Sequence, residues 1–385
     1  MTGRDNFAMG TLGITDSVLS RAQAVADVLA DQADALTGHV DAWELLSGRA
    51  ALLELAPQGR VSAGGATRLL RTLDGWSALT LSRTDDLAAV PALLEADDSA
   101  DDPWPAIECW AAARTSADVV ERAVLLGLPV AALGEAEGAP PRVIGCGTAG
   151  PTRPLGELLV VDLSSMWAGP LCGQLLFRAG ATVVKVESPG RPDGTRLGDR
   201  RFFDWMNAGK LCYAADFDRD RDALARLLQA ADVVLEGSRP DALTRRGLGP
   251  HDIAPLSGRV WVRITGHGTD ENGRARVAFG DDAAVAGGLV GRGPDGPVFV
   301  GDAIADPLTG LAAAHAVLDA VQRGGGLLAE VAMSAVAATY AAGPSGAVVD
   351  APPATPVGID SSAAELGAHQ AEVEALVAGR IGPPC

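Results

Sequence analysis

The chain has 385 residues, of which 48% are hydrophobic, and a formal net charge of −18 at pH 7. Its length and apolar content predict a large buried core shared between two or more domains. This much negative charge disfavours nucleic acid and anionic membrane surfaces as partners. The five cysteines and five histidines show no CxxC, HExxH or paired Cys/His spacing. That pattern argues against a disulfide scaffold, and it predicts no metal site.

The first ten residues, MTGRDNFAMG, lack the basic stretch and following apolar stretch of a signal peptide. No apolar run in the chain reaches the roughly 18 residues that a membrane helix needs. The sequence therefore predicts a soluble, cytoplasmic protein.

The first third of the chain predicts a helical segment followed by a small mixed domain. Apolar residues at helical spacing predict a helix within 14–36, inside an N-terminal segment of residues 1–44. Residues 45–145 mix short strand-like and helical pieces, which predicts a small α+β domain. Within it, GWSALTLS (75–82) alternates as a strand does, and ADVVERAVLLGLPVAAL (117–133) has the pattern of a helix, a glycine stop and a strand.

The Gly/Pro-rich stretch 134–154 predicts a domain boundary, and repeated βαβ patterns follow it. Strands are predicted at ELLVVDL (157–163), ATVVKVE (181–187), within 221–237 and at RVWVRITG (259–266), with helices at 169–180 and 305–323. This alternation predicts an α/β fold, a doubly wound, Rossmann-like parallel sheet over residues 151–342, with the smaller α+β domain placed N-terminally. The tail, 343–385, predicts a helix over 363–377 that packs back on the large domain.

Two features bear on anion binding. GCGTAG (145–150) matches GxGxxG, but PTRP follows where a helix should begin, so a linker is the better interpretation. The two lysines of the chain, Lys185 and Lys210, fall in one window that also holds several arginines. Chance can account for this placement; the functional alternative is an ammonium group required against a phosphate or carboxylate.

Five stretches in the second half of the chain carry a resemblance to a known family: LLVVDLSSMWAGPLCGQLLFRAGATVVKVESPG, FFDWMNAGKLCYAADF, ADVVLEGSRPDALTRRGLG, RVWVRITGHG and VGDAIADPLTGLAAAHAVLDAV. In this order they resemble class III CoA-transferases, the family of formyl-CoA transferase, carnitine CoA-transferase and α-methylacyl-CoA racemase. The resemblance implies an enzyme that moves CoA between carboxylic acids. It implies acyl-CoA as a substrate, no tightly bound cofactor and a homodimer.

The order of the parts differs from that family. TRLLRTLDGWSALTLS and residues 102–133 resemble the family's small domain, which in the family follows the Rossmann-like domain. Here the small domain comes first, and ELGAHQAEVEALV (365–377) resembles the family's C-terminal tail. The chain resembles a rearranged version of the fold with a single connection between the domains. A dimer with ordinary rather than interlocked contacts is therefore expected.

Two aspartates lie close together in VGDAIADPLTG (300–310). By resemblance, Asp306 matches the family's nucleophilic aspartate, which carries covalent acyl and CoA intermediates. An Asp-Pro pair before an apolar helix also has the pattern of an N-cap. The two roles are compatible, because a helix N-terminus favours an ionised carboxylate. Asp302 matches no functional position of the family, so capping or solvent exposure is expected for it.

The resemblance also implies contacts with CoA. Trp167 and Ala168 match the loop that contacts the reactive end of CoA. Asn207 and Lys210 match an NxxK element at the CoA site, and Arg245 matches an arginine beside it.

Two positions are expected to contact the substrate acid. His267 lies where the family has an aromatic residue near the acyl pocket. Asp282 ends the triplet Gly280-Asp281-Asp282, which matches a Gly-His-Asp triplet of the racemases. The triplet here has no histidine, which disfavours a two-base racemase. The family's later glycine-rich loop also has no clear counterpart. Two alternatives to CoA transfer therefore stay open: a non-catalytic acyl-CoA-binding paralogue or subunit, and an acyl-CoA racemase or isomerase.

Overall fold

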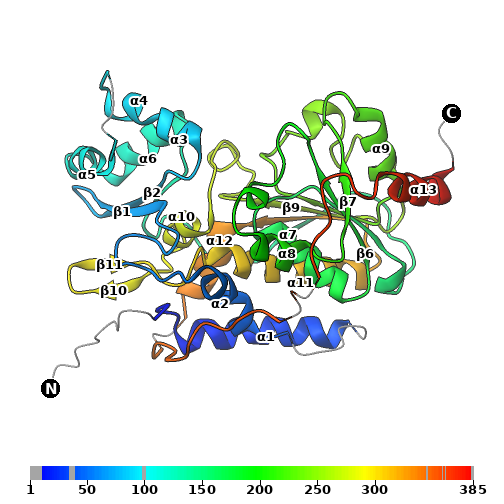
Figure 1. Ribbon diagram of the computed structural model, residues 1–385, viewed down its shortest axis with the longest axis horizontal. Coiled ribbons are helices and arrows are strands. Elements are labelled where there is room, and N and C mark those ends of the chain that lie inside the picture. Colours follow the sequence, from blue (N-terminus) through cyan, green and yellow to red (C-terminus); the bar gives the residue numbers. More distant parts are fainter. Residues whose placement is uncertain are drawn as a thin grey trace.

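The computed structural model describes residues 11–33, 40–97, 101–343, 346–357, 359 and 361–382. Its largest element is a seven-stranded sheet with the strand order β4-β12-β9-β8-β5-β6-β7 (Figure 1). The strands are β4 (Arg142–Gly145), β5 (Leu159–Asp162), β6 (Thr182–Glu187), β7 (Leu211–Ala214), β8 (Val233–Glu236), β9 (Val260–Thr265) and β12 (Leu327–Ala332). All neighbours are parallel except β4 and β12, which are antiparallel. The predicted α/β class is confirmed.

The strands of this sheet are apolar on both faces. In β5, Val160 belongs to one apolar core, whereas Leu159 and Val161 belong to the other, because successive side chains of a strand point to opposite faces. Helices pack on both faces: α7 (Ala168–Arg178) and α11 (Ala305–Gln322) on the first, and α9 (Arg221–Ala230) and α13 (Gln370–Ile381) on the second. The sheet is therefore doubly wound, as predicted.

A second, three-stranded antiparallel sheet lies N-terminal to the large one. Its strands are β1 (Thr67–Arg71), β2 (Trp76–Thr80) and β3 (Val130–Ala132), and the helices beside it are α3 (Thr84–Ala88), α4 (Val90–Leu94), α5 (Trp104–Ala112) and α6 (Ser116–Leu125). These elements bury their own apolar core, which includes Leu70, Leu79 and Ile107. The predicted strand at 75–82 and the helix and strand within 117–133 all form here.

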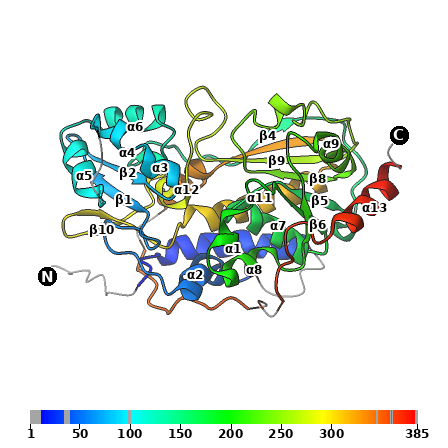
Figure 2. The ribbon, with the colours of Figure 1, turned by 45° about the horizontal axis from the view of Figure 1, so that its top comes forward.

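The helices before this small sheet pack on the large one. α1 (Asp16–Gln32) lies along α11, and α2 (Ala42–Leu53) contacts α1, α11 and α8 (Arg200–Asn207) (Figures 1 and 2). Buried α2 residues such as Leu45 and Leu46 belong to a core of the large sheet. The domain boundaries stay a prediction, and these contacts favour a small domain that begins after α2 rather than at residue 45.

The segment 346–357 crosses the outside of α2 (Figure 2). The indole N–H of Trp43 donates to the carbonyl oxygen of Pro352 at 3.0 Å, and the N–H of Ala354 donates to Ser47 Oγ at 2.9 Å. A Cβ at Gly48 would collide with Pro356 and with the Trp205 ring. Glycine is therefore required at this position, and α2 is held between the tail segment and α8.

The tail helix packs against α9, as predicted, but it begins at Gln370 rather than at residue 363. The residue just before the helix, His369, and its first residue, Gln370, bind the edge strand β7 through their side chains. His369 Nδ1 accepts from the N–H of Cys212 at 2.9 Å, and Gln370 Oε1 accepts from the N–H of Ala214 at 3.0 Å. Unpaired backbone groups of an edge strand need such partners, which explains the late start of the helix.

The other elements are α10 (Gly280–Ala286), α12 (Met333–Ala341), the hairpin of β10 (Gly291–Gly293) and β11 (Gly296–Val298), and the short 3₁₀ turns η1 (Leu155–Glu157), η2 (Gly194–Leu197) and η3 (Thr244–Arg246). Among the described residues, no helix is long and apolar enough to cross a membrane.

Candidate active site

Asp306 lies where the starts of three helices meet. It is in the first turn of α11, and its carboxyl group is hydrogen-bonded to the backbone of Ala168, the first residue of α7. Gly280, the first residue of α10, lies so close that a Cβ there would collide with Asp306 Oδ2 and the carbonyl oxygen of Ala303. Helix N-termini carry partial positive charge. The fold therefore places the half-buried Asp306 in hydrogen-bond contact with the backbone of Ala168, beside the starts of three helices.

The structure corrects both capping expectations. The residue at the N-cap of α11 is Ile304, and no side chain caps the helix, so Asp306 is the second residue of the helix. Asp302 is neither a cap nor exposed: it is fully buried and lies 2.5 Å from Arg49. Local sequence reasoning missed this role because the partner of Asp302 comes from a helix far away in the chain.

Arg49 is a site residue that the sequence analysis did not identify. It belongs to α2, and its guanidinium lies 5.6 Å from the ring centroid of Trp167 and 5.3 Å from that of Phe202. The two rings contact each other edge to face, with centroids 5.3 Å apart. One signal was available in the sequence. Arg49 falls on the helical face of Leu45 and Leu46, where a charged side chain is unexpected.

Three aspartates, Asp281, Asp302 and Asp306, feel the charge of Arg49. Burial raises the pKa of Asp306 to about 7, against the opposing effect of Arg49, and the neighbouring carboxylate of Asp281 raises it further. Burial and Asp302 together raise the pKa of Asp281 to about 6. Burial also raises the pKa of Asp302. Burial thus outweighs the effect of the helix N-termini, and Asp306 is about half ionised near pH 7.

Another buried aspartate, Asp282, lies at the interface with the small sheet. Its Oδ1 accepts hydrogen bonds from Thr80 Oγ1 at 2.9 Å and from the N–H of Phe279 at 3.0 Å. Its Oδ2 is buried and has no hydrogen-bond partner among the described residues. Burial raises its pKa to about 7. The predicted substrate contact at Asp282 stays a prediction, because the side chain mainly joins α10 to β2.

Asn207 and Lys210 contact each other, and both face inward. Lys210 is buried, and its ammonium group donates to Asp162 at 3.0 Å, to Asn207 Oδ1 at 3.1 Å and to the carbonyl oxygen of Pro170 at 2.8 Å. All three donors of the ammonium are therefore used within the protein. Asn207 is also fully buried. In this arrangement both side chains are used within the protein, and their predicted contact with CoA stays a prediction.

Both lysines stabilise the loop between β5 and α7. Lys185 donates to the carbonyl oxygen of Ser164 at 2.6 Å and to Asp193 at 2.7 Å, and Asp193 accepts from the N–H of Met166 at 3.2 Å. Burial alone would raise the pKa of Asp162, but the ammonium groups of Lys210 and Lys185 hold it below its usual range. This buried network fixes the loop that leads to Trp167 and Ala168.

The loops after β5 and β8 meet at the centre of the large sheet. The chain runs outward from β5 to β7 and then restarts at β8 in the opposite direction, and ligands of such sheets bind at this switch point. Trp167 and Ala168 follow β5, and Arg245 follows β8 in η3. Arg245 is exposed, and its side chain has no hydrogen bond or ion pair within the described part of the chain. Its predicted contact with CoA stays a prediction.

His267 follows β9, and it has a buried ring nitrogen. Its Nε2 has no hydrogen-bond partner among the described residues. Burial and the nearby Arg276 lower the pKa of His267 to about 3, so the ring is neutral near pH 7. No contact between His267 and Asp306 is found in the described structure, and its predicted role near the acyl group stays a prediction.

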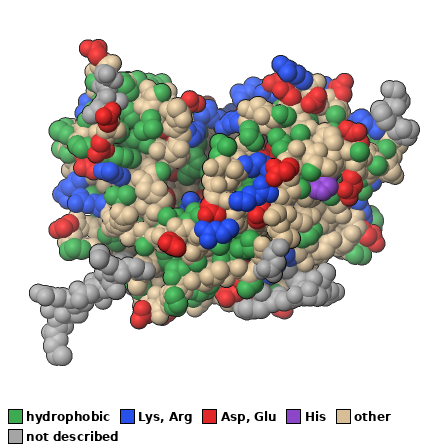
Figure 3. All heavy atoms as spheres, in the orientation of Figure 1, with side chains coloured by type: hydrophobic (Ala, Val, Ile, Leu, Met, Phe, Trp, Pro, Cys, Tyr) green, Lys and Arg blue, Asp and Glu red, His purple; other side chains and the backbone are tan. Residues whose placement is uncertain are grey.

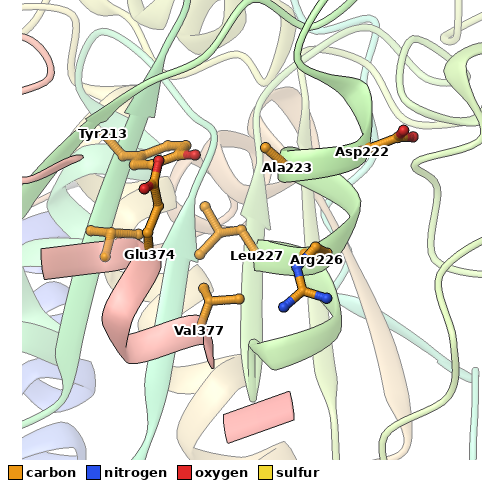
Figure 4. Close-up of a pocket in the computed structure, with 8 residues that line it drawn as sticks. Tyr213, Asp222, Ala223, Arg226, Leu227, Glu374 and Val377 are labelled. Atoms are coloured by element: carbon orange, nitrogen blue, oxygen red, sulfur yellow. The ribbon is translucent and has the colours of Figure 1, made fainter. Parts of the chain in front are cut away.

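A pocket of about 380 Å³ lies elsewhere, between β7, α9 and α13 (Figure 4). Leu227 and Val377 point toward each other across it, whereas Asp222 points away. None of the residues predicted for the active site lines it. Within the described residues, no group of three or more His, Cys, Asp or Glu side chains is arranged to hold a metal ion.

Comparison with known proteins agrees with the resemblance seen in the sequence. Residues 155–364 match the sequence model of CoA-transferase family III. The chain is 30% identical over 198 residues to succinyl-CoA–D-citramalate CoA-transferase of Chloroflexus aurantiacus, covering 47% of this chain and 49% of that protein. It is 33% identical over 190 residues to a probable fatty acyl-CoA transferase, Rv3272, of Mycobacterium tuberculosis, covering 45% of this chain and 48% of the relative.

A crystal structure of Rv3272 from M. tuberculosis aligns with 49% of this chain and 56% of that one, at 32% identity and a TM-score of 0.45. The chain spans about half the length of the curated relatives it matches. The match to the family covers 210 of the 385 residues, from 155 to 364. The chain therefore belongs to CoA-transferase family III.

Proposed function

We propose that the protein transfers CoA between carboxylic acids, with Asp306 as the nucleophile. The observation that carries this proposal is the position of Asp306: a half-buried residue at the start of α11, whose carboxylate is hydrogen-bonded to the backbone at the start of α7. A carboxylate nucleophile splits one difficult transfer into easier steps. Membership of CoA-transferase family III supports the same chemistry.

The first half of the reaction forms a covalent intermediate on Asp306. The Asp306 carboxylate attacks the thioester carbonyl of the donor, the C–S bond breaks, and a mixed anhydride and the CoA thiolate result. The thiolate then attacks the side-chain carbonyl of Asp306. This step gives an aspartyl-CoA thioester and releases the donor acid as its carboxylate. In the second half, an acceptor carboxylate attacks the aspartyl thioester, and the released thiolate takes the acyl group from the new anhydride.

The helix starts at Asp306 supply the electrostatic part of this mechanism. Each attack places negative charge on a carbonyl oxygen, and fixed backbone N–H groups stabilise such oxyanions. The hydrogen bond between the backbone of Ala168 and Asp306 places one of these groups at the reacting carboxyl. Gly280 leaves room for the tetrahedral intermediates, because it has no Cβ to collide with the carboxylate.

CoA is proposed to bind along the loops after β5 and β8, with contacts from Trp167, Ala168 and Arg245. The face drawn in Figure 3 is hollowed between the part of the chain that carries α3 and the part that carries α9, and basic side chains lie beside the hollow. A polyanion with an apolar arm suits basic groups beside an aromatic loop. Lys210 and Asn207 would act indirectly, by holding that loop.

We also propose a homodimer with ordinary contacts between the two copies. In this chain the small sheet precedes the large one, so the interlocking expected from the family's usual chain order need not follow. Light scattering at micromolar concentration is the measurement, and a monomer alone would contradict the proposal.

Isotope exchange tests the function directly. The protein is incubated with acetyl-, propionyl- or succinyl-CoA and the matching ¹⁴C-labelled acid, and the label in the thioester is measured over time. Exchange is expected with wild type and with Asp319→Asn, an exposed carboxylate on the far part of α11. Asp306→Asn is expected to abolish it. Full exchange by Asp306→Asn would rule out Asp306 as the nucleophile.

A racemase would give a different result. Exchange of the α-hydrogen of propionyl-CoA with deuterium from the solvent, without exchange of labelled acid, would favour the racemase alternative. Binding of the thioesters without either exchange would favour a non-catalytic acyl-CoA-binding protein.

A further inference from the structure

We propose that Arg49 binds the free carboxylate of the substrate acid and presents it to Asp306. This inference rests on the proposed function, because it assigns a position to the acid that attacks the aspartyl thioester. Arg49 lies in α2, outside residues 155–364 that match the family. The acid site would therefore be built by a segment that the family match does not include.

The guanidinium of Arg49 is held firmly but is only partly used. Its Nη1 lies 2.5 Å from Asp302 Oδ1. Its guanidinium carbon, Cζ, lies 5.3 Å from the ring centroid of Phe202 and 5.6 Å from that of Trp167. The arginine side chain is 24% exposed, whereas that of Asp302 is fully buried. Among the described residues, Asp302 is the one hydrogen-bond acceptor of Arg49. The remaining N–H groups are therefore free to bind a second carboxylate.

The charges around Asp306 require a cation at this place. Asp281 and Asp302 both raise the pKa of Asp306, which means that their fields repel negative charge there. An incoming carboxylate meets the same repulsion. Arg49 acts in the opposite direction on all three aspartates. A guanidinium can bind a carboxylate through two parallel N–H···O hydrogen bonds, which fixes the direction of the acid as well as its position.

The surroundings of Arg49 supply a second donor. The indole Nε1 of Trp167 is buried and has no hydrogen-bond partner among the described residues. A buried donor without an acceptor is costly. A ligand oxygen bound beside the Trp167 ring would satisfy this donor. The next residue along the chain, Ala168, is the one hydrogen-bonded to Asp306, so the ring lies one residue away from a direct contact of the nucleophile.

The proposed step changes no bond at Arg49. The guanidinium holds the acceptor carboxylate while one carboxylate oxygen attacks the aspartyl thioester carbonyl. The C–S bond breaks, and the electron pair leaves with the CoA thiolate. In the first half of the reaction, the same guanidinium receives the donor acid as it is released. The site therefore selects for a carboxylate and against a neutral isostere such as an amide.

A binding measurement tests the inference independently of turnover. Saturation-transfer NMR follows the protons of acetate and succinate at constant ionic strength, with acetamide as the neutral control. Wild type is expected to bind both acids and not acetamide. Arg49→Met is expected to weaken acid binding by at least about tenfold, which corresponds to the loss of one charge-assisted hydrogen-bonded pair. Arg49→Lys, which keeps the charge but not the planar fork, is expected to fall between them.

Arg68 offers a matched control. It is 27% exposed, lies 3.3 Å from Glu108, and stacks on a tryptophan, Trp104, at 4.7 Å from the ring centroid. Arg68→Met therefore removes a similar side chain from the small sheet and is expected to leave acid binding within about twofold of wild type. Steady-state kinetics give a second measurement for Arg49→Met: its KM for the acid is expected to rise, whereas its KM for acyl-CoA stays unchanged.

Two results would overturn the inference. One is acid binding that stays unchanged in Arg49→Met, or in Arg49→Lys if the methionine variant does not fold. The other is a wild type that exchanges acid into acyl-CoA, together with an Arg49→Met variant whose KM for the acid is the same as that of wild type. Absence of any exchange in wild type would instead refute the proposed function, and the NMR titration would still decide whether Arg49 binds carboxylates.

Discussion

Arg49 Nη1 lies 2.5 Å from Asp302 Oδ1, although 253 positions separate the two residues in the chain. The contact joins α2, which precedes the small sheet, to the turn before α11, which carries Asp306. The environment of the proposed nucleophile is therefore assembled from segments that lie far apart in the chain. Packing of α2 on the large sheet is a condition for the site.

Asp302→Asn tests the contribution of this ion pair to stability. Removing one partner of a buried pair leaves the other charge without compensation, and we expect the free energy of unfolding to fall by about 1–3 kcal/mol. Urea unfolding followed by circular dichroism measures it. Asp319 pairs with Arg323 on the exposed side of α11, and Asp319→Asn is expected to change stability by less than about 0.5 kcal/mol. Equal effects of the two substitutions would show that burial of the Asp302 pair is energetically unimportant.

The rate of exchange is expected to rise with pH between about 6 and 8. The pKa of Asp306 is raised to about 7, and only the ionised carboxylate is a nucleophile. A pH–rate profile with the Arg49→Lys variant as comparison checks this. A profile that is flat over this range would mean that ionisation of Asp306 does not limit the reaction.

Stability is expected to change with pH in the opposite direction. Asp281, Asp282 and Asp306 all have folded-state pKa values, about 6, 7 and 7, above the ordinary value of 3.8. Between about pH 4 and 7 these three groups bind more protons in the folded protein than in the unfolded chain, which outweighs the opposite contribution of His267, and the free energy of unfolding falls as the pH rises. Chemical unfolding at pH 5 and pH 8 measures the difference. Asp282→Asn should reduce this dependence, and a protein more stable at pH 8 than at pH 5 would contradict the assignment.

Gly280→Ala is expected to lower exchange by at least about tenfold, because the new Cβ would collide with the Asp306 carboxylate and displace it from a near-attack position. The exchange assay and thermal unfolding are measured together. At Gly379 in α13 a Cβ would meet no atom within 4 Å. Gly379→Ala should keep full activity and gain a few tenths of a kcal/mol to about 1 kcal/mol of stability. Unchanged exchange in Gly280→Ala would place the reacting groups elsewhere.

A double substitution separates the two roles considered for Lys210. Lys210→Met leaves the carboxylate of Asp162 buried without its partner, and a loss of about 3–5 kcal/mol is expected. Lys210→Met combined with Asp162→Asn removes both charges and should recover part of that stability together with CoA affinity. Calorimetry with CoA distinguishes the alternatives. A stable double variant that does not bind CoA would restore Lys210 as a direct ligand.

The elements of the large sheet were predictable because their signals are local. The apolar run of ELLVVDL and the glycine after GQLLFRA mark a buried strand and the end of a helix, and β5 and α7 form there. The late start of α13 was not predictable. His369 and Gln370 are used to satisfy the edge of β7, and such a contact depends on which strand lies at the edge.

The site was predictable only in part. The resemblance identified Asp306 as the candidate nucleophile, and the structure places it beside Ala168. Asp302 was assigned from local capping rules, which contain no information about Arg49. Lys210 shows the same limit: the resemblance placed it at the CoA site, but the buried carboxylate of Asp162, which comes from β5, binds its ammonium group.

The central claim is that Asp306 becomes covalently linked to CoA. Its most direct test is to incubate the protein with acyl-CoA, reduce with borohydride and map the modified residue by peptide mass spectrometry. An aspartyl-CoA thioester is reduced to homoserine, and we expect this change at Asp306, in an amount that depends on acyl-CoA and disappears in Asp306→Asn. Homoserine at another aspartate, or an unmodified Asp306 in protein that exchanges labelled acid into acyl-CoA, would contradict the account.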